Sequence, residues 1–273
     1  MAALYAHSPA ATMRTSALKV AVPLYVAGIA AAEVCVVWVA VVPGVLAHAV
    51  LVFVLVNHYV LAQRASGTLA PPDRPRTDAA LIVLAVVPLV RITSLATALD
   101  TEPVYQYAAA GLPLLAGGVA GVRLLGVAWF VPKLRAISWR QQAPIALSGM
   151  PLGYAAFLIA RPEPLVEGSS VSRLLLAALI VVVCTGFAEE LLFRGVCQRG
   201  LSGVFGRFAY LGSTFLFAIA YLGVRPAGYA VFVVVAGLAF GFLVEHTRSL
   251  LGVALAHALM NVGLLLVWPA LLD

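Results

Sequence analysis

Long apolar segments recur along this chain, separated by short polar breaks. A window of about 19 residues finds nine of them, and the two near 144–160 and 208–223 are close to the lower length limit for a membrane-spanning helix. All nine segments are 18–42, 44–63, 79–99, 105–131, 144–160, 171–195, 208–223, 228–245 and 249–268. Because backbone amides find no water in hydrocarbon, such segments must be helical. The pattern predicts an all-α polytopic transmembrane helix bundle of eight or nine spans.

The charges in the polar breaks indicate the orientation of this bundle. Acidic or nearly bare breaks such as "LDTEP" and "RPEPLVEGSS" alternate with basic ones. The basic breaks carry Arg14 and Lys19; Arg64, Arg74 and Arg76; Lys133, Arg135 and Arg140; Arg199 and Arg207; and Arg248. The positive-inside rule then places the N-terminus in the cytoplasm, with residues 65–78 as a polar, Pro-rich cytoplasmic linker. The first segment has no convincing cleavage site after it, so we expect it to be retained as a span.

Composition supports this class of protein. Hydrophobic residues make up 63% of the chain, charged residues 10%, and the mean hydropathy is +1.05, whereas a soluble domain carries nearer a quarter charged residues. The formal net charge of +6 is explained by the positive-inside rule, so we expect the lipid bilayer and no nucleic acid as a partner. Cys35, Cys184 and Cys197 lack metal-ligand spacing and are predicted to be buried apolar fillers. The Ala/Val-rich composition favours a multi-pass protein of a bacterial plasma membrane.

The stretch "GFAEELLFRG" places two carboxylates and a guanidinium within a hydrophobic run. Each uncompensated charge near a bilayer centre costs roughly 3 kcal/mol or more. Glu190 and Arg194 are four residues apart and are predicted to pair on one helix face. Glu189 then lies about 100° round the helix and points elsewhere. The alternative is that all three lie at the cytoplasmic membrane edge, where Arg194 can extend to water.

A second polar pair lies in the last apolar segment. His257 and Asn261 are four residues apart, and at about 1.5 Å per residue they lie at a depth similar to that of Glu189. A lone intramembrane histidine is often only a packing residue, but two polar side chains on one stripe favour a bundle interior or a wet cavity. A carboxylate, an imidazole and an amide in one layer would supply a base for water and donors for a developing oxyanion.

The order Glu-Glu-x-x-x-Arg and then His-x-x-x-Asn resembles the CAAX prenyl protease 2 and bacteriocin-processing family (CPBP, or Abi) of intramembrane endopeptidases. The resemblance covers roughly residues 140–268. It implies that Glu189 activates the attacking water, that Glu190 and Arg194 are structural, and that His257 and Asn261 stabilise the oxyanion or orient the water. It also implies a membrane-associated protein or peptide substrate, lipidated in CAAX processing, and zinc has been proposed for some members.

The chain departs from this family at one position. The family places a histidine four residues after a phenylalanine, and the matching stretch "STFLFAIAYLGVRP" has Phe217 followed by Tyr221. Tyrosine donates a hydrogen bond but, with a pKa near 10, is a poor base and an unlikely zinc ligand. A zinc site would depend on Glu189 and His257, and two ligands are few for a tight zinc site. Hydrolysis without a metal and loss of proteolysis both remain open. We predict that Glu189, Tyr221, His257 and Asn261 face one cavity.

Two alternatives to a protease follow from other residues. The replacement at Tyr221 favours a non-catalytic membrane scaffold or partner-binding protein. A small transporter would use Glu33, Arg91 and Arg123 as pathway charges, although no inverted repeat supports it. For the polar residues of the first spans, interhelical hydrogen bonding or interface snorkelling is the simpler interpretation. We expect N-terminal transmembrane helices over residues 1–140 and the family-like core, with both motifs, over 141–273.

Overall fold

The computed structural model of the chain describes residues 9–64, 78–96, 102–124, 138–166, 168, 170–222 and 227–272. Within these ranges the regular structure is helical and contains no strand, which confirms the predicted all-α class. The predicted linker lies outside the described residues except for Asp78. The division of the chain into N-terminal helices over residues 1–140 and a family-like core over 141–273 stays a prediction.

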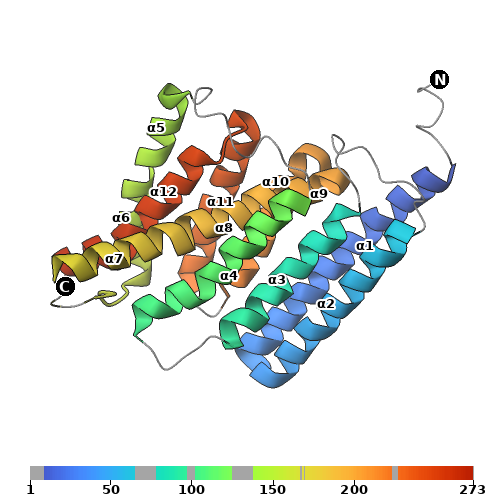
Figure 1. Cartoon of the computed structure of the whole chain (residues 1–273), viewed down its shortest axis with the longest axis horizontal. Helices are drawn as coiled ribbons and strands as arrows, with labels where there is room; N and C mark the ends of the chain where they lie inside the picture. Colours follow the sequence, from blue (N-terminus) through green and yellow to red (C-terminus); the bar gives the residue numbers. More distant parts are fainter. Residues whose placement is uncertain are drawn as a thin grey trace.

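The N-terminal helices form one side of the bundle. Helix α1 (Pro9–Val34) continues through a π-helical turn, η1 (Cys35–Val39), and α2 (Val41–Arg64) returns beside it. Helix α3 (Ala79–Ala96) packs mainly on α2 and also contacts α1, so the three lie side by side (Figure 1). Helix α4 (Pro103–Leu124) lies between this group and the C-terminal helices.

The C-terminal helices surround one long helical segment. This segment runs through α7 (Val171–Val181), η4 (Val182–Phe187), α8 (Ala188–Glu190), η5 (Leu191–Cys197) and α9 (Gln198–Phe205). A 3₁₀ turn, η6 (Gly206–Phe208), reverses the chain into α10 (Ala209–Ala220), which packs on α11 (Ala227–Thr247). Helix α12 contacts η4, α5 and α6, and Figure 1 shows it beside the long segment. The remaining elements are α5 (Trp139–Leu147), α6 (Gly149–Ala160), α12 (Leu251–Val262), η7 (Gly263–Val267) and α13 (Trp268–Leu272).

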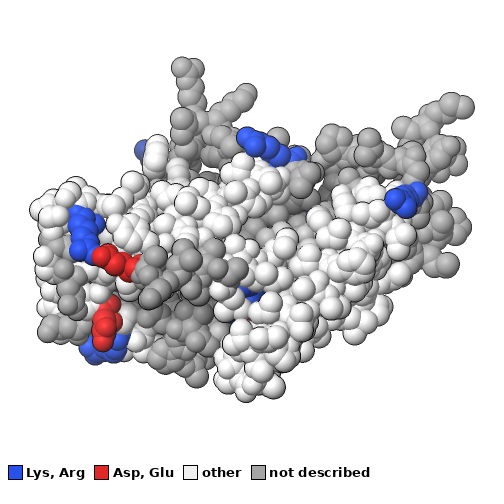
Figure 2. All heavy atoms as spheres, turned by 60° about the horizontal axis from the view of Figure 1, so that its bottom comes forward, with Lys and Arg blue, Asp and Glu red and all other residues white. Residues whose placement is uncertain are grey.

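Each apolar segment predicted from the sequence overlaps a helix in the described part of the chain. Six helical segments in the described part of the chain are long and apolar enough to cross a membrane, and the longest of them, Val171–Ala220, has 50 residues and includes the reversal at η6. The multi-pass membrane class is therefore supported, whereas the count of eight or nine spans and the cytoplasmic N-terminus stay predictions. Figure 2 shows a broad uncharged face whose described charged side chains lie mostly near its margins, as expected of a surface in contact with lipid.

Two polar residues of the first spans, Glu33 and Arg91, pair with each other, as the simpler interpretation predicts. Arg91 donates from Nε to both carboxylate oxygens of Glu33, at 3.0 and 2.8 Å, and its Nη2 lies 2.7 Å from Oε2. His48 Nε2 lies 3.5 Å from the same carboxylate, and both Glu33 and His48 are fully buried. The expected pairing of Arg91 is thus confirmed. Arg123, in contrast, is exposed and has no carboxylate partner among the residues described.

Of the other polar residues in these spans, His58 makes the expected contact between helices, whereas Asn57 bonds within its own helix. His58 Nδ1 lies 2.9 Å from the Tyr25 hydroxyl, and Asn57 donates to the Phe53 carbonyl. The three cysteines are free thiols, of which Cys184 and Cys197 are buried. Neither these hydrogen bonds nor the three cysteines indicate a chemical site.

Glu33→Gln tests whether the buried pair stabilises the N-terminal helices. The change leaves the Arg91 charge without its carboxylate, and breaking a buried pair in this way costs about 3–5 kcal/mol. We therefore expect a much lower free energy of unfolding, measured by denaturant titration of the purified protein in detergent. The matched control is Glu102→Gln, which breaks an exposed pair with Arg173 and should cost about 1 kcal/mol or less. Equal losses in the two variants would contradict this interpretation.

Candidate active site

The Glu-Glu motif lies in an irregular part of the long helical segment. Glu189 and Glu190 belong to the three-residue α8, and π-helical turns precede and follow it in η4 and η5. A π turn carries more residues than an α turn, so it rotates the side chains that follow relative to an ideal helix. Such turns occur frequently at functional sites. Nothing in the hydrophobic periodicity of this stretch predicted them.

Close contact between η4 and α12 brings the two predicted motifs together. A Cβ atom built on Gly186 would lie 2.6 Å from Ala258 Cα, so only glycine permits this approach. Small residues at helix interfaces allow backbones in membrane proteins to pack closely. Gly186 is three residues before Glu189, and Ala258 is next to His257. This contact therefore places the carboxylates of α8 against the imidazole of α12.

Glu189 lies between Tyr221 and His257. The Tyr221 hydroxyl, at the C-terminal end of α10, donates to Glu189 Oε2 over 2.7 Å. His257 Nε2 lies 3.8 Å from the same oxygen, beyond direct hydrogen-bonding range. The Glu189 side chain is 13% exposed, whereas the His257 side chain is 2% exposed. His257 therefore does not face lipid, and the phenol occupies the place at the carboxylate that the resemblance gives to a histidine.

Glu190 holds His257 from the other side. Its Oε1 lies 2.7 Å from His257 Nδ1, and its Oε2 lies 3.3 Å from Arg194 Nε. The predicted Glu190–Arg194 pair is therefore present, and the side chains of both residues are fully buried. The Arg194 guanidinium also lies over the Phe217 ring, 4.3 Å from its centroid. The contact with His257 was not predicted, because the spacing of residues within one helix carries no information about partners on another helix.

Asn261 lies one turn beyond His257 but does not contact Glu189 in any recorded hydrogen bond. Its Nδ2 donates over 2.9 Å to Thr185 Oγ1, and the Thr185 hydroxyl in turn donates to the Val181 carbonyl. The sequence did not predict that Thr185 would be the partner of Asn261. It precedes Glu189 by four residues, so its polar side chain near the motif was a usable signal. This hydrogen bond ties Asn261 to η4, the turn that directly precedes α8.

A small cavity adjoins these residues. It is lined by Tyr221 and His257 together with apolar side chains of α10 and α11, and it offers about 10 Å³ to the centre of a water molecule, the room of about one water. Glu189 and Asn261 are absent from its lining. The prediction of one shared cavity therefore holds for Tyr221 and His257. Glu189 does not line this cavity but contacts both of these side chains. His246 stacks on Phe242 near the end of α11 and is not part of this group.

The donor set does not fit zinc. Structural and catalytic zinc sites use three or four His, Cys, Asp or Glu ligands. No group of three such side chains that could hold a metal ion occurs among the described residues. Glu189 and His257 supply two donors, and the third group in contact is the phenol of Tyr221.

The N-terminal helices contact this site through the backbone. Arg91 Nη2 donates over 3.2 Å to the carbonyl of Ala220, the residue immediately before Tyr221. The same guanidinium is held by Glu33. The buried pair of α1 and α3 is therefore attached to the end of α10, where Tyr221 turns toward Glu189.

Comparison with known proteins gives one match. No curated protein and no solved structure matches the chain. The model of the type II CAAX prenyl endopeptidase Rce1-like family matches residues 171–263, about a third of the chain. The matched range contains the Glu-Glu motif, Tyr221, His257 and Asn261, all of which the geometry brings to one region. Over these residues the chain is similar to the type II CAAX prenyl endopeptidase Rce1-like family, a family of membrane proteases.

Proposed function

We propose that this protein is a catalytically competent intramembrane endopeptidase that hydrolyses a peptide bond of a membrane-associated substrate with water activated by Glu189. The observation that carries the proposal is the convergence of the Tyr221 hydroxyl and His257 Nε2 on one oxygen of Glu189, at 2.7 and 3.8 Å. A scaffold does not require such an arrangement. We place the protein in the cell membrane, with a bacterial plasma membrane as the setting that its composition favours.

Glu189 is the general base in this mechanism. Tyr221 occupies Oε2, and Oε1 has no hydrogen-bond partner among the described residues. A water on Oε1 gives its proton to Glu189 as its oxygen bonds to the scissile carbonyl carbon. When the tetrahedral intermediate collapses, the C–N bond breaks and Glu189 passes the proton to the leaving nitrogen. Proton transfer by a positioned side chain contributes about 10²–10⁴-fold to such reactions.

His257 and Asn261 orient the water and stabilise the oxyanion. The Glu190 carboxylate accepts a hydrogen bond from His257 Nδ1, which fixes the ring and directs Nε2 toward Glu189. His257 Nε2 then lies beside Glu189, where it can contact the attacking water or the developing oxyanion. One N–H of Asn261 is held by Thr185, and the second is left for the same oxyanion. Arg194 neutralises Glu190 and so supports the group without taking part in the chemistry.

A lipid-bearing substrate is consistent with an apolar cavity next to the motif. This cavity has about 260 Å³, opens between α3, α4 and η5, and includes Leu192, three residues after Glu189. Its lining is apolar apart from Thr93. We propose that it receives the hydrocarbon chain of a lipidated peptide, as in CAAX-type processing. Bacteriocin-type processing would not require this cavity to be filled.

Glu189→Gln tests the base. The change keeps the shape of the side chain but removes its basicity, so we expect kcat to fall by about 10²–10⁴-fold. The assay is cleavage of a prenylated CAAX peptide by the purified protein in bilayers, with an unprenylated peptide of the same sequence in parallel. Glu163→Gln, at an exposed loop position, should leave the rate unchanged. Wild-type cleavage by the Glu189 variant would favour a non-catalytic scaffold instead.

Tyr221→Phe tests the departure from the family pattern. Loss of a hydrogen bond to a charged group costs about 1.5–3 kcal/mol, so we expect kcat to fall by about tenfold or more with little change in KM. Tyr221→His restores a donor and should retain more activity than Tyr221→Phe. The matched control is Tyr154→Phe, at a ring that packs on Trp268 and whose hydroxyl has no hydrogen-bond partner among the described residues. An unchanged rate in Tyr221→Phe would show that the phenol has no role in the reaction.

Metal removal tests the donor set. Since two strong donors are too few for a tight zinc site, we expect the cleavage rate to change by less than about twofold after dialysis against a chelator. Metal content would be measured in the same sample by elemental analysis. Loss of activity that zinc restores would contradict the metal-free mechanism while leaving Glu189 essential.

A further inference from the structure

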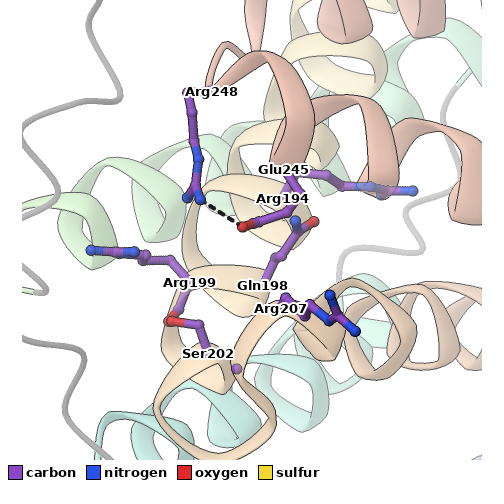
Figure 3. A pocket seen from close by; sticks show the side chains of 8 residues that line it. Arg194, Gln198, Arg199, Ser202, Arg207, Glu245 and Arg248 are labelled. Atoms are coloured by element: carbon purple, nitrogen blue, oxygen red, sulfur yellow. Dashed lines mark hydrogen bonds and ion pairs between the residues drawn. The ribbon is translucent and has the colours of Figure 1, made fainter.

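A third cavity lies at the end of the bundle where α9 turns into α10, apart from the small cavity beside His257 and the apolar cavity beside Leu192. It has about 270 Å³ of space for the centre of a water molecule and is lined by Gln198, Ser202, Gly206, Glu245 and the four arginines Arg194, Arg199, Arg207 and Arg248. Figure 3 shows these side chains coming from the long helical segment, the following turn and the end of α11. Four guanidinium groups and one carboxylate at one cavity form a strongly positive site.

The charges of this cavity are only partly compensated. Arg248 Nη2 pairs with Glu245 Oε1 at 2.9 Å, and Arg194 pairs with Glu190. Arg199 and Arg207, in contrast, have no carboxylate within ion-pairing distance in the part of the chain that the structure describes. Figure 3 shows Arg199 and Arg207 extending to either side of the cavity, so both can rotate inward onto a bound group.

Buried polar atoms at the base of the cavity also lack partners. Arg194 has no hydrogen-bond acceptor for Nη1 or Nη2, and Gln198 Oε1 has no donor, although both side chains are buried. Buried polar groups without partners are costly, and they commonly indicate a bound ion or ordered water. This observation is independent of the surface arginines. It shows that the base of the cavity can accept polar ligand atoms or the waters around them.

The cavity adjoins an apolar surface on α10 and α11. Phe208, Leu211 and Phe215 are 50%, 46% and 48% exposed at spacings of three and four residues, which places them on one face. Phe242 is 54% exposed, contacts Tyr210 of α10 and precedes Glu245 by three residues. A polar ligand in the cavity would therefore have exposed hydrocarbon directly beside it. This combination favours an amphipathic ligand over a freely soluble one.

We propose that this cavity, bounded by Arg199, Arg207 and Arg248, binds the phosphate of an anionic phospholipid headgroup, with the acyl chains lying along α10 and α11. Guanidinium groups bind phosphate oxygens through paired, charge-assisted hydrogen bonds. The positive-inside expectation places these arginines at the cytoplasmic leaflet, where anionic lipids attract basic residues. The site shares Arg194 with the group that supports His257, but it contains none of the proposed catalytic residues and does not depend on proteolysis.

Native mass spectrometry of the full-length protein in detergent tests the proposal. The protein is titrated with phosphatidylglycerol and with phosphatidylcholine of the same acyl chains. We expect phosphatidylglycerol to bind about tenfold more tightly. Since each arginine near the membrane surface contributes about a fivefold gain, the double variant Arg199→Gln/Arg207→Gln should lose most of that preference. Glycerol 3-phosphate, added as a soluble source of the same phosphate group, should not displace the lipid at equal concentration.

Two further variants make the result specific. Arg140→Gln removes an exposed arginine outside the cavity and should retain the preference. Glu245→Gln removes the competing carboxylate and should increase the affinity for phosphatidylglycerol several-fold, an effect that misfolding cannot imitate. Equal binding of the two lipids by the wild type, or an equal loss in Arg140→Gln, would overturn the proposal. Displacement by glycerol 3-phosphate would overturn the lipid as the source of the phosphate.

Discussion

The buried chain that joins Arg194 to Glu190 by an ion pair and Glu190 to His257 by a hydrogen bond is the interaction on which the rest of the site depends. Its members are almost completely excluded from solvent, with ion-pair distances of 3.3 and 2.7 Å. In an interior of low dielectric constant each charge is costly alone, and removing one partner leaves the others uncompensated. The chain therefore fixes α12 against α8 in one register. Glu189 obtains its position beside His257 as a consequence of that register.

A second buried pair extends this constraint to the N-terminal helices. Glu33 holds Arg91, and Arg91 donates to the carbonyl before Tyr221. The phenol that contacts Glu189 is thus located partly by residues more than a hundred positions earlier in the chain. The family match begins at residue 171 and does not include these helices. Their contribution to the site is physical attachment of α10, which a comparison of the matched segment alone would not reveal.

The sequence predicted the parts of this arrangement that are local along the chain. The lengths of the apolar segments predicted the helices, and the spacing of four residues predicted the Glu190–Arg194 pair. Both features depend only on residues within one helix. The contact between Glu190 and His257, the Thr185 partner of Asn261 and the attachment of Arg91 to α10 join different helices. Periodicity within a helix carries no information about such partners. The π turns around α8 also change the direction of the side chains without leaving a trace in hydrophobicity.

Tyrosine at position 221 restricts what the site can do. A histidine beside Glu189 could accept a proton, donate a hydrogen bond or bind a metal, whereas a phenol near neutral pH acts mainly as a hydrogen-bond donor. The 2.7 Å bond to Glu189 retains that donor function. His257 is the one other titratable side chain within 4 Å of Glu189 among the described residues. With tyrosine at this position, the proton transfer that the proposed mechanism requires depends on Glu189 and His257 alone. Glu190 and Arg194 hold His257 in place.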